Sequence, residues 1–325
     1  MLHCFIINPA AGKGRDQAAI VPKIMELAKW WKIDYEIHRT VGVGEATLYV
    51  KDRINANAGN TVRFYSIGGD GTSREIINGL YGNPDAELAI VPIGSGNDFV
   101  RNFGSEKPFL DISQQIAGKT MPVDVMYCDS NLAELTGYAL NMFNFGFDAK
   151  VVSHMARMRN TSLLHGTGAY VAGVIRELSS YKMSRAEIRI DDEEAFKVDI
   201  LLTGIGNGRF SGGGFDGIPM ASVNDGFLDL MVVNPISRFE FIRAVGSYRK
   251  GQHFEHPLLK GKIIHKRCRK VLISPVDELA FSADGESMTT RYPLRISIAD
   301  EPIKFVLPSG VDMSATESSE AQQEN

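Results

Sequence analysis

The sequence predicts a Rossmann-like α/β domain with a parallel sheet, followed by a β-rich antiparallel sandwich domain. In the first 124 residues, short apolar runs alternate with amphipathic segments, which is the order of strands and helices in a doubly wound sheet. Further on, alternating or β-branched runs lie between turn signals, which favours antiparallel strands. We therefore predict domains at 1–124 and 125–312, with a disordered polar tail at 313–325.

The elements of the first domain follow one another regularly. A strand at Leu2–Ile7 precedes a helix whose apolar face carries Ile20, Ile24 and Leu27, and the same face places Trp31 in the core. The rest of this domain is predicted as strands at 33–38, 62–67 and 88–93 and helices at 46–55, 72–80 and 97–102. Ligands of such sheets bind beyond the carboxyl ends of the strands, and three glycine-bearing loops lie at those ends.

The second domain is predicted from shorter patterns. Its strands are expected at 123–127, 186–190, 196–200 and 271–273, and helices at about 149–158 and 163–178 interrupt them. We expect the active cleft between the two domains.

Composition sets limits on function. The chain has 325 residues, a net charge of −4 and a pI near 6.0, which argues against a nucleic-acid partner because neutralising phosphates needs a basic surface. Three isolated cysteines predict neither disulfides nor a zinc site, and no window reaches the run of about 18 apolar residues that a membrane span needs. We expect a cytoplasmic protein, with peripheral contact to the inner membrane face as a further expectation.

The loop Gly68–Thr72 carries the strongest chemical signal. Its three glycines let the backbone take positive φ and approach a ligand, and the helix after it turns free N–H groups toward a phosphate. Asp70 would repel that phosphate unless a divalent cation lay between them, and magnesium takes one or two carboxylates while keeping several waters. The loop therefore predicts a nucleotide-using phosphotransferase.

A second glycine loop runs from Pro92 to Phe99. Ser95 can donate to a phosphate oxygen, and Asn97 or Asp98 can cap the helix that follows, although such a loop alone is most simply a turn. The chain has no Gly-x-x-x-x-Gly-Lys-Ser/Thr, which excludes a P-loop of that type. The Gly-x-Gly pairs lack a third glycine, which counts against a dinucleotide-binding site.

In this order, the motifs resemble the diacylglycerol kinase catalytic family, which includes bacterial lipid kinases and sphingosine kinases. The resemblance covers nearly the whole chain and rests on Asn8-Pro9 with Gly12–Gly14, Gly68–Glu75, Pro92–Phe99, Gly206–Arg209 with Gly212–Gly214, Asp225–Asp229 and Asp284–Glu286. It implies ATP, magnesium and phosphorylation of a lipid hydroxyl, with diacylglycerol giving phosphatidic acid as the first expectation.

The resemblance also implies roles for particular residues. Those that would hold ATP are Asn8, Gly12, Thr40, Gly68, Gly69, Asp70, Gly71, Thr72, Ser73, Arg74, Glu75, Ser95 and Asn97. Of these, Arg74 stands where an asparagine is common in the family, and Ser95 stands where a threonine is frequent. Asp70 would be catalytic together with Glu286, the general base for the lipid hydroxyl.

A structural magnesium ion is also implied, bound by the Asp225 carboxylate and the main-chain oxygens of Ser222 and Phe227. Without the resemblance, Asp284-Gly285-Glu286 is most simply a hairpin turn, and Asp225-Gly226 is a turn that enters a strand.

Other interpretations stay open. A soluble NAD kinase-like or phosphofructokinase-like enzyme also uses a Gly-Gly-Asp-Gly turn, and a non-catalytic sensor ranks last because the acidic residues are present. The basic stretch 260–270 fits either a membrane contact or, more simply, a solvated strand face. The acceptor is open among diacylglycerol, phosphatidylglycerol, sphingoid and polyprenol lipids, and so is the oligomeric state, a homodimer included.

Overall fold

The computed structural model describes residues 1–14, 17–147 and 183–311. The chain divides into two compact units. The first unit comprises Met1–Val125 together with Ala299–Asn325, and the second comprises Met126–Ile298. Each unit has its own sheets and its own buried core.

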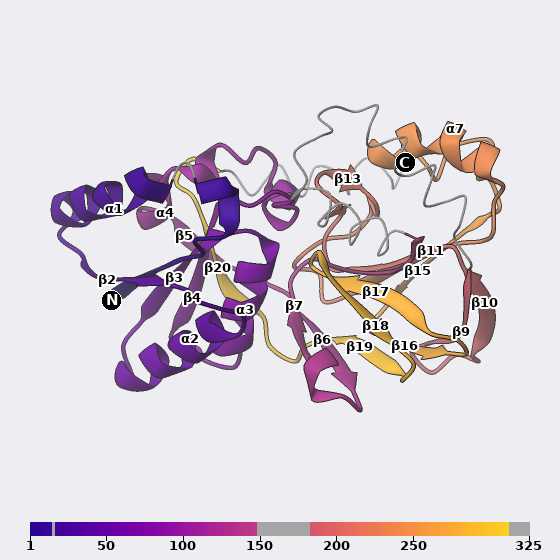
Figure 1. Cartoon of the computed structure of the whole chain (residues 1–325), viewed down its shortest axis with the longest axis horizontal. Coiled ribbons are helices and arrows are strands. Elements are labelled where there is room, and N and C mark those ends of the chain that lie inside the picture. The colour runs from indigo at the N-terminus through magenta and orange to yellow at the C-terminus, as the bar shows by residue number, and fades with distance from the viewer. Residues whose placement is uncertain (15–16, 148–182, 312–325) are drawn as a thin grey trace. The chain divides into compact units, whose positions relative to one another are not determined.

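The first unit contains one six-stranded sheet in the order β2-β1-β3-β4-β20-β5 (Figure 1). Its strands are β1 (Leu2–Ile7), β2 (Asp34–Arg39), β3 (Val62–Gly68), β4 (Ala86–Pro92), β5 (Lys119–Val123) and β20 (Ile303–Leu307). All neighbours pair in parallel except β5, which is antiparallel to β20. The predicted α/β domain with a parallel sheet is confirmed.

Helices cover both faces of this sheet (Figure 1). The longer ones are α1 (Gln17–Trp31), α2 (Glu45–Ala56) and α3 (Asp70–Leu80), and the short ones are η1 (Ala11–Gly14), η2 (Phe99–Phe103), η3 (Pro108–Leu110) and α4 (Ile112–Ile116). Ile24 of α1 and Ile116 of α4 join one buried cluster with Phe5 and Tyr65 of the sheet. The predicted helix at 97–102 is the 3₁₀ helix η2.

Trp31 is not a core residue, contrary to the prediction from its helical spacing. The side chain is 37% exposed, and its indole N–H donates to Ser113 Oγ at 3.2 Å. Because Trp31 is the last residue of α1, it lies past the turns that pack on the sheet, and its polar N–H finds a surface partner.

The last strand of the chain corrects the predicted domain boundary. The second domain was expected to run to residue 312, but the second unit ends at Ile298 and β20 lies in the first sheet. Phe305 and Val306 are fully buried there, which explains why the chain returns to this sheet. The first unit is therefore built from two separated segments.

The second unit is a sandwich of two six-stranded antiparallel sheets. One sheet has the order β10-β9-β16-β19-β6-β7, with β6 (Met126–Ser130), β7 (Gly137–Ala139), β9 (Ser184–Ile190), β10 (Phe196–Ile200), β16 (Lys270–Pro275) and β19 (Leu294–Ile298). The other has the order β15-β14-β11-β8-β17-β18, with β8 (Met142–Gly146), β11 (Leu202–Gly206), β14 (Leu228–Val233), β15 (Ile263–Cys268), β17 (Leu279–Ala283) and β18 (Glu286–Thr290).

One buried cluster contains residues of both sheets, including Ile188 and Ile296 from the first and Phe145 and Phe281 from the second. This core confirms the predicted antiparallel sandwich. Among its described residues, the unit also contains the 3₁₀ helix η4 (Ala133–Leu135), the helix α7 (Arg238–Arg249) and the small hairpin β12 (Phe210–Ser211) and β13 (Phe215–Asp216).

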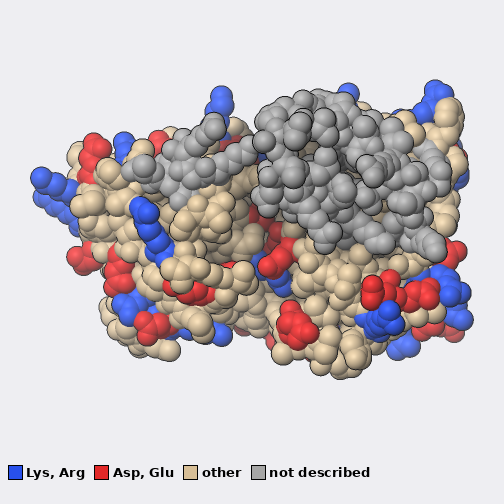
Figure 2. Space-filling view, in the orientation of Figure 1, with Lys and Arg blue, Asp and Glu red and all other residues tan. Residues whose placement is uncertain are grey.

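The other predicted elements differ in how far the structure describes them. The single strand predicted at 123–127 is two strands, because β5 ends at Val123 and β6 begins at Met126, where the chain passes from one unit to the other. The helices predicted near 149–158 and 163–178 and the predicted tail lie outside the described residues. No described helix is long and apolar enough to cross a bilayer. Figure 2 shows charged side chains of both signs on the described surface of each unit.

Candidate functional site

The loops after β1, β3 and β4 meet at the carboxyl edge of the first sheet. Their strands are neighbours in register, with Ile7 opposite Ile67 and Gly68 opposite Pro92. The Asn8 N–H donates to the Ile67 carbonyl and the Ile93 N–H donates to the Gly68 carbonyl, both at 3.0 Å. The structure thus brings together the three loops that the sequence placed at strand ends.

These loops approach more closely than any side chain would permit. A Cβ on Gly94 would lie 2.3 Å from the Gly69 Cα, and a Cβ on Gly68 would lie 2.4 Å from Thr72 Oγ1. Gly12 has φ of +62°, whereas Gly68, Gly69 and Gly71 do not take positive φ. The expectation that positive φ explains these three glycines is wrong. Gly68 and Gly69 meet close neighbours instead.

Asp70 joins two of the loops. Its carboxylate accepts the Asn97 N–H at 2.8 Å and the Asp98 N–H at 3.0 Å. Asp70 is also the first residue of α3, where a negative charge is stabilised by the helix dipole. Charge-assisted bonds of this kind are among the stronger hydrogen bonds in proteins. In the structure Asp70 therefore braces the loops, a function that needs no metal ion.

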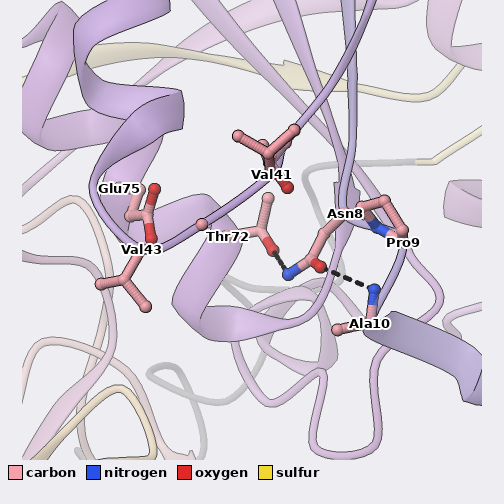
Figure 3. Close-up of a pocket in the computed structure, with 9 residues that line it drawn as sticks. Asn8, Pro9, Ala10, Val41, Val43, Thr72 and Glu75 are labelled. Atoms are coloured by element: carbon pink, nitrogen blue, oxygen red, sulfur yellow. Dashed lines mark hydrogen bonds between the residues drawn. The ribbon is translucent and has the colours of Figure 1, made fainter.

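A cavity of about 310 Å³ opens beside these loops (Figure 3). It is lined by Asn8, Pro9, Ala10, Thr40, Val41, Gly42, Val43, Thr72 and Glu75, four of which belong to the predicted nucleotide site. Asn8 Nδ2 donates to Thr72 Oγ1 at 2.9 Å, and Asn8 Oδ1 accepts the Ala10 N–H at 2.9 Å. Asn8 thus ties the first loop to α3 at the wall of the cavity.

Two glutamates lie beside the cavity, one bonded to the wall formed by residues 40–43 and one to the start of α2. Glu45 accepts the Val41 N–H at 2.5 Å and lies 2.8 Å from His38 Nε2, and the Val41 hydrogen bond lowers the pKa of Glu45. Glu75 Oε2 accepts the Ala46 N–H at 3.2 Å, next to the start of α2. The sequence analysis missed Glu45. The available signal was an acid at the first position of a helix that follows a glycine.

Other predicted nucleotide residues shape the loops. Ser73 is buried, and its hydroxyl lies 2.9 Å from the Ser66 hydroxyl, so it joins α3 to β3. Asn97 takes φ of +55°, and its Nδ2 donates to the carbonyls of Pro92 and Gly94. Ser95 is exposed in the same loop, and Arg74 is half-buried in α3.

In the second unit, Asp284 and Gly285 form a two-residue hairpin turn between β17 and β18. Both have positive φ, 46° and 81°, and Ala283 pairs with Glu286 across the turn. The Asp284 carboxylate is buried and accepts the N–H groups of Leu140, Asn141 and Met142 at 2.7, 2.9 and 3.1 Å. This role was not expected, although the sequence analysis singled out the motif.

Glu286 is the next residue after this turn. It is exposed and is the first residue of β18. The backbone of Asp284-Gly285-Glu286 is therefore a hairpin turn, as one of the two interpretations predicted. The predicted base, Glu286, is the exposed residue that follows this turn. Glu286 and Asp70 belong to different units.

The predicted magnesium carboxylate, that of Asp225, already has partners within the protein. Asp225 Oδ1 accepts the Phe227 N–H at 3.0 Å, while Asp225 Oδ2 forms an ion pair with the Arg267 guanidinium. Ser222 Oγ donates to Asn224 Oδ1 at 3.1 Å. A fixed cation beside the carboxylate repels a second, divalent one. Among the described residues, no group of three or more His, Cys, Asp or Glu side chains is placed to hold a metal.

The basic stretch 260–270 is paired with acidic side chains of its own unit. The pairs are Lys262 with Glu240 at 2.5 Å, His265 with Asp229 at 2.6 Å, Lys266 with Glu193 at 3.5 Å, Arg267 with Asp225, and Lys270 with Asp192 at 3.8 Å. Internal pairing favours the solvated strand face over a membrane contact, which stays an untested prediction.

In chain order, an α/β unit with glycine loops at the ends of its strands precedes a β-sandwich, and proteins of known families share this arrangement. The family model described as the diacylglycerol kinase catalytic domain matches residues 3–128. The model described as the YegS C-terminal NAD kinase beta sandwich-like domain matches residues 141–307. The chain therefore belongs to the family in which a diacylglycerol kinase catalytic domain is joined to a YegS C-terminal domain.

Individual relatives are similar along most of their length. The chain is 26% identical over 312 residues to the Bacillus subtilis protein named "Putative lipid kinase YtlR", covering 93% of this chain and 98% of that protein. It is 27% identical over 284 residues to a "Probable lipid kinase YegS-like" protein of Pectobacterium atrosepticum, covering 85% and 88%. A crystal structure of a "putative diacylglycerol kinase from Bacillus anthracis str. Sterne" matches its fold with a TM-score of 0.70 at 24% identity, covering 96% of this chain and 98% of that one.

Proposed function

We propose that the protein is an ATP-dependent lipid kinase, which transfers the γ-phosphate of ATP to the hydroxyl of a membrane lipid. The first candidate acceptor is diacylglycerol, which would give phosphatidic acid. The proposal rests on the family to which the chain belongs and on the names of its relatives.

One structural observation carries the nucleotide half of the proposal. Gly69 and Gly94 bring two loops together, the Asp70 carboxylate fixes that approach, and a cavity lined by Thr40 and Thr72 opens beside them. The loops lie at the start of α3, where the positive end of the helix dipole favours a phosphate. We assign the triphosphate to residues 68–74 and further contacts to Thr40 and Ser95.

In phosphoryl transfer the protein contributes mainly positioning and charge stabilisation and takes little part in covalent bonding. The lipid oxygen bonds to the γ-phosphorus as the bond from that phosphorus to the bridging oxygen breaks, and ADP leaves. The hydroxyl proton goes to a carboxylate, the role that we propose for Glu286. Magnesium, bound with the phosphates of ATP, would neutralise charge that develops on the phosphoryl oxygens.

The test is to incubate the purified full chain with labelled ATP and magnesium in the presence of lipid vesicles. Separate reactions offer diacylglycerol, phosphatidylglycerol, a sphingoid base or a polyprenol, with free NAD and fructose 6-phosphate as soluble alternatives. We expect label in phosphatidic acid. Label on NAD or on the sugar, with none on any lipid, would refute the proposal. Label on another lipid would correct only the acceptor.

A further inference from the structure

The carboxylate that was expected to bind a structural metal has a cationic partner within the protein. Asp225 lies in the loop before β14, and Arg267 lies on the neighbouring strand β15, opposite Asp229 in the register. The Arg267 side chain reaches Asp225 and forms an ion pair with Oδ2. The Asp225 side chain is only 15% exposed, so this pair is largely shielded on the acidic side.

A second contact fixes the guanidinium in place. Arg267 Cζ lies 4.5 Å from the centre of the Phe227 ring, and Arg269 Cζ lies 5.0 Å from the same centre. Phe227 also donates its backbone N–H to Asp225 Oδ1. One loop residue therefore orients the carboxylate through its backbone and supports the arginine through its ring, a favourable cation–π geometry.

A magnesium ion would meet strong competition here. Magnesium needs a nearly octahedral set of oxygen ligands and loses its waters reluctantly. Arginine keeps its charge at any ordinary pH, so it cannot make way by losing a proton. To bind the Asp225 carboxylate, the ion would have to displace a cation that is held at both of its contacts.

The neighbouring acid also contacts a side chain of β15. Asp229 is 2% exposed, and its Oδ1 lies 2.6 Å from His265 Nε2, also on β15. Two carboxylates of the segment 225–229 are thus paired with basic side chains of one strand. Of these two contacts, the one with Arg267 supplies a positive charge to the segment.

We propose that Arg267 takes the place of a divalent cation at Asp225, so that the loop before β14 holds its conformation without magnesium. The guanidinium neutralises the carboxylate and ties the loop 225–227 to β15. The inference concerns the folding of the second unit and is independent of the proposed reaction, in which magnesium accompanies ATP.

The experiment measures thermal unfolding of the full chain without nucleotide, in EDTA and in about 5 mM magnesium at matched ionic strength. The wild type should have the same midpoint in both. Arg267→Ser should unfold at a lower temperature in EDTA, and magnesium should raise its midpoint by roughly 2–4 °C. Lys266→Ser is the matched control. It removes a positive charge from the same strand, but Lys266 pairs with Glu193 and not with Asp225. It should show no magnesium response.

A double variant identifies the ligand. Arg267→Ser combined with Asp225→Asn should lose the magnesium response. If Arg267→Ser does not fold, Arg267→Gln is used in its place. This variant keeps the aliphatic part of the side chain over Phe227. The proposal would be overturned if magnesium raised the unfolding midpoint of the wild type and if Asp225→Asn abolished that response. An Arg267 variant that folds but shows no response to magnesium would also overturn it.

Discussion

Asp70 in the first unit and Asp284 in the second occupy comparable places, each in a glycine turn that follows a strand. Asp70 accepts two backbone N–H groups and Asp284 accepts three, in each case from a distant loop. The turns differ in what comes next. The Asp70 turn opens the helix α3, whereas the Asp284 turn is a tight hairpin that leaves Glu286 exposed. In both motifs the aspartate holds the backbone, and the groups available to a ligand lie beside it.

The largest stability effect is expected at the second turn. Asp284→Ala leaves three buried N–H groups without their acceptor and should lower the free energy of unfolding by roughly 3–5 kcal/mol. Asp284→Asn is the matched control, because asparagine tolerates positive φ and keeps one carbonyl oxygen. Denaturant unfolding of both variants measures the difference. An alanine variant with the same free energy of unfolding as the wild type would show that these three hydrogen bonds do not stabilise the turn.

A smaller effect is expected at the first turn, where the Asp70 carboxylate accepts the N–H groups of Asn97 and Asp98. Asp70→Ala should lower the free energy of unfolding by roughly 2–3 kcal/mol and weaken nucleotide binding, because the N–H groups of Asn97 and Asp98 lose their acceptor. Denaturant unfolding and titration with ATP measure the two consequences. An Asp70→Ala protein with unchanged stability but no activity would favour a purely catalytic role for this carboxylate.

Two glycines of the first site differ in whether a side chain would meet a close neighbour. Gly94→Ala places a Cβ 2.3 Å from the Gly69 Cα and should cost about 1–3 kcal/mol through forced separation of the loops. A Cβ on Gly71 meets nothing within 4 Å, so Gly71→Ala should be neutral or stabilise the helix by up to about 1 kcal/mol. Equal losses of melting temperature in the two variants would contradict this account.

A further loss of stability is expected in mild acid, to which a buried histidine in each unit contributes. Burial lowers the pKa of His3 to about 4 and that of His253 to about 4, below the value near 6.5 of an unfolded chain. Protons therefore bind the unfolded chain first, and the stability present above pH 6.5 is lost as the pH falls toward 4. Thermal unfolding at pH 7 and pH 5 should show this fall. His253→Leu should reduce it, whereas the control His256→Gln should not, and an unchanged acid response in His253→Leu would refute the assignment.

Much of the first unit could be predicted because its signals are local. The alternation of apolar runs and amphipathic segments located β1, β3 and α3, and it predicted that their loops share one edge of a sheet. The return of β20 to the first sheet could not be predicted, because the partner of a strand depends on contacts between residues far apart in sequence. Trp31 was assigned to the core because helical spacing says nothing of where the packed part of a helix ends.

The motifs predicted the location of the site, but they did not predict the contacts that each side chain makes. Asp70 and Asp284 act on backbone groups of distant loops, and no spacing in the sequence reveals such partners. Arg267 was counted only as part of a basic stretch, since its pairing with Asp225 depends on the register of β14 and β15. Motifs therefore locate functional turns better than they assign a role to each side chain.

The central claim is that Glu286, at the exposed end of the Asp284 turn, takes the proton of the lipid hydroxyl. The most direct test is a single-turnover measurement of phosphoryl transfer from labelled ATP to diacylglycerol vesicles by the wild type and by Glu286→Gln. We predict unchanged nucleotide binding and melting temperature in the variant, with transfer slowed by about 10²–10⁴-fold. Transfer by Glu286→Gln at the wild-type rate would contradict the claim.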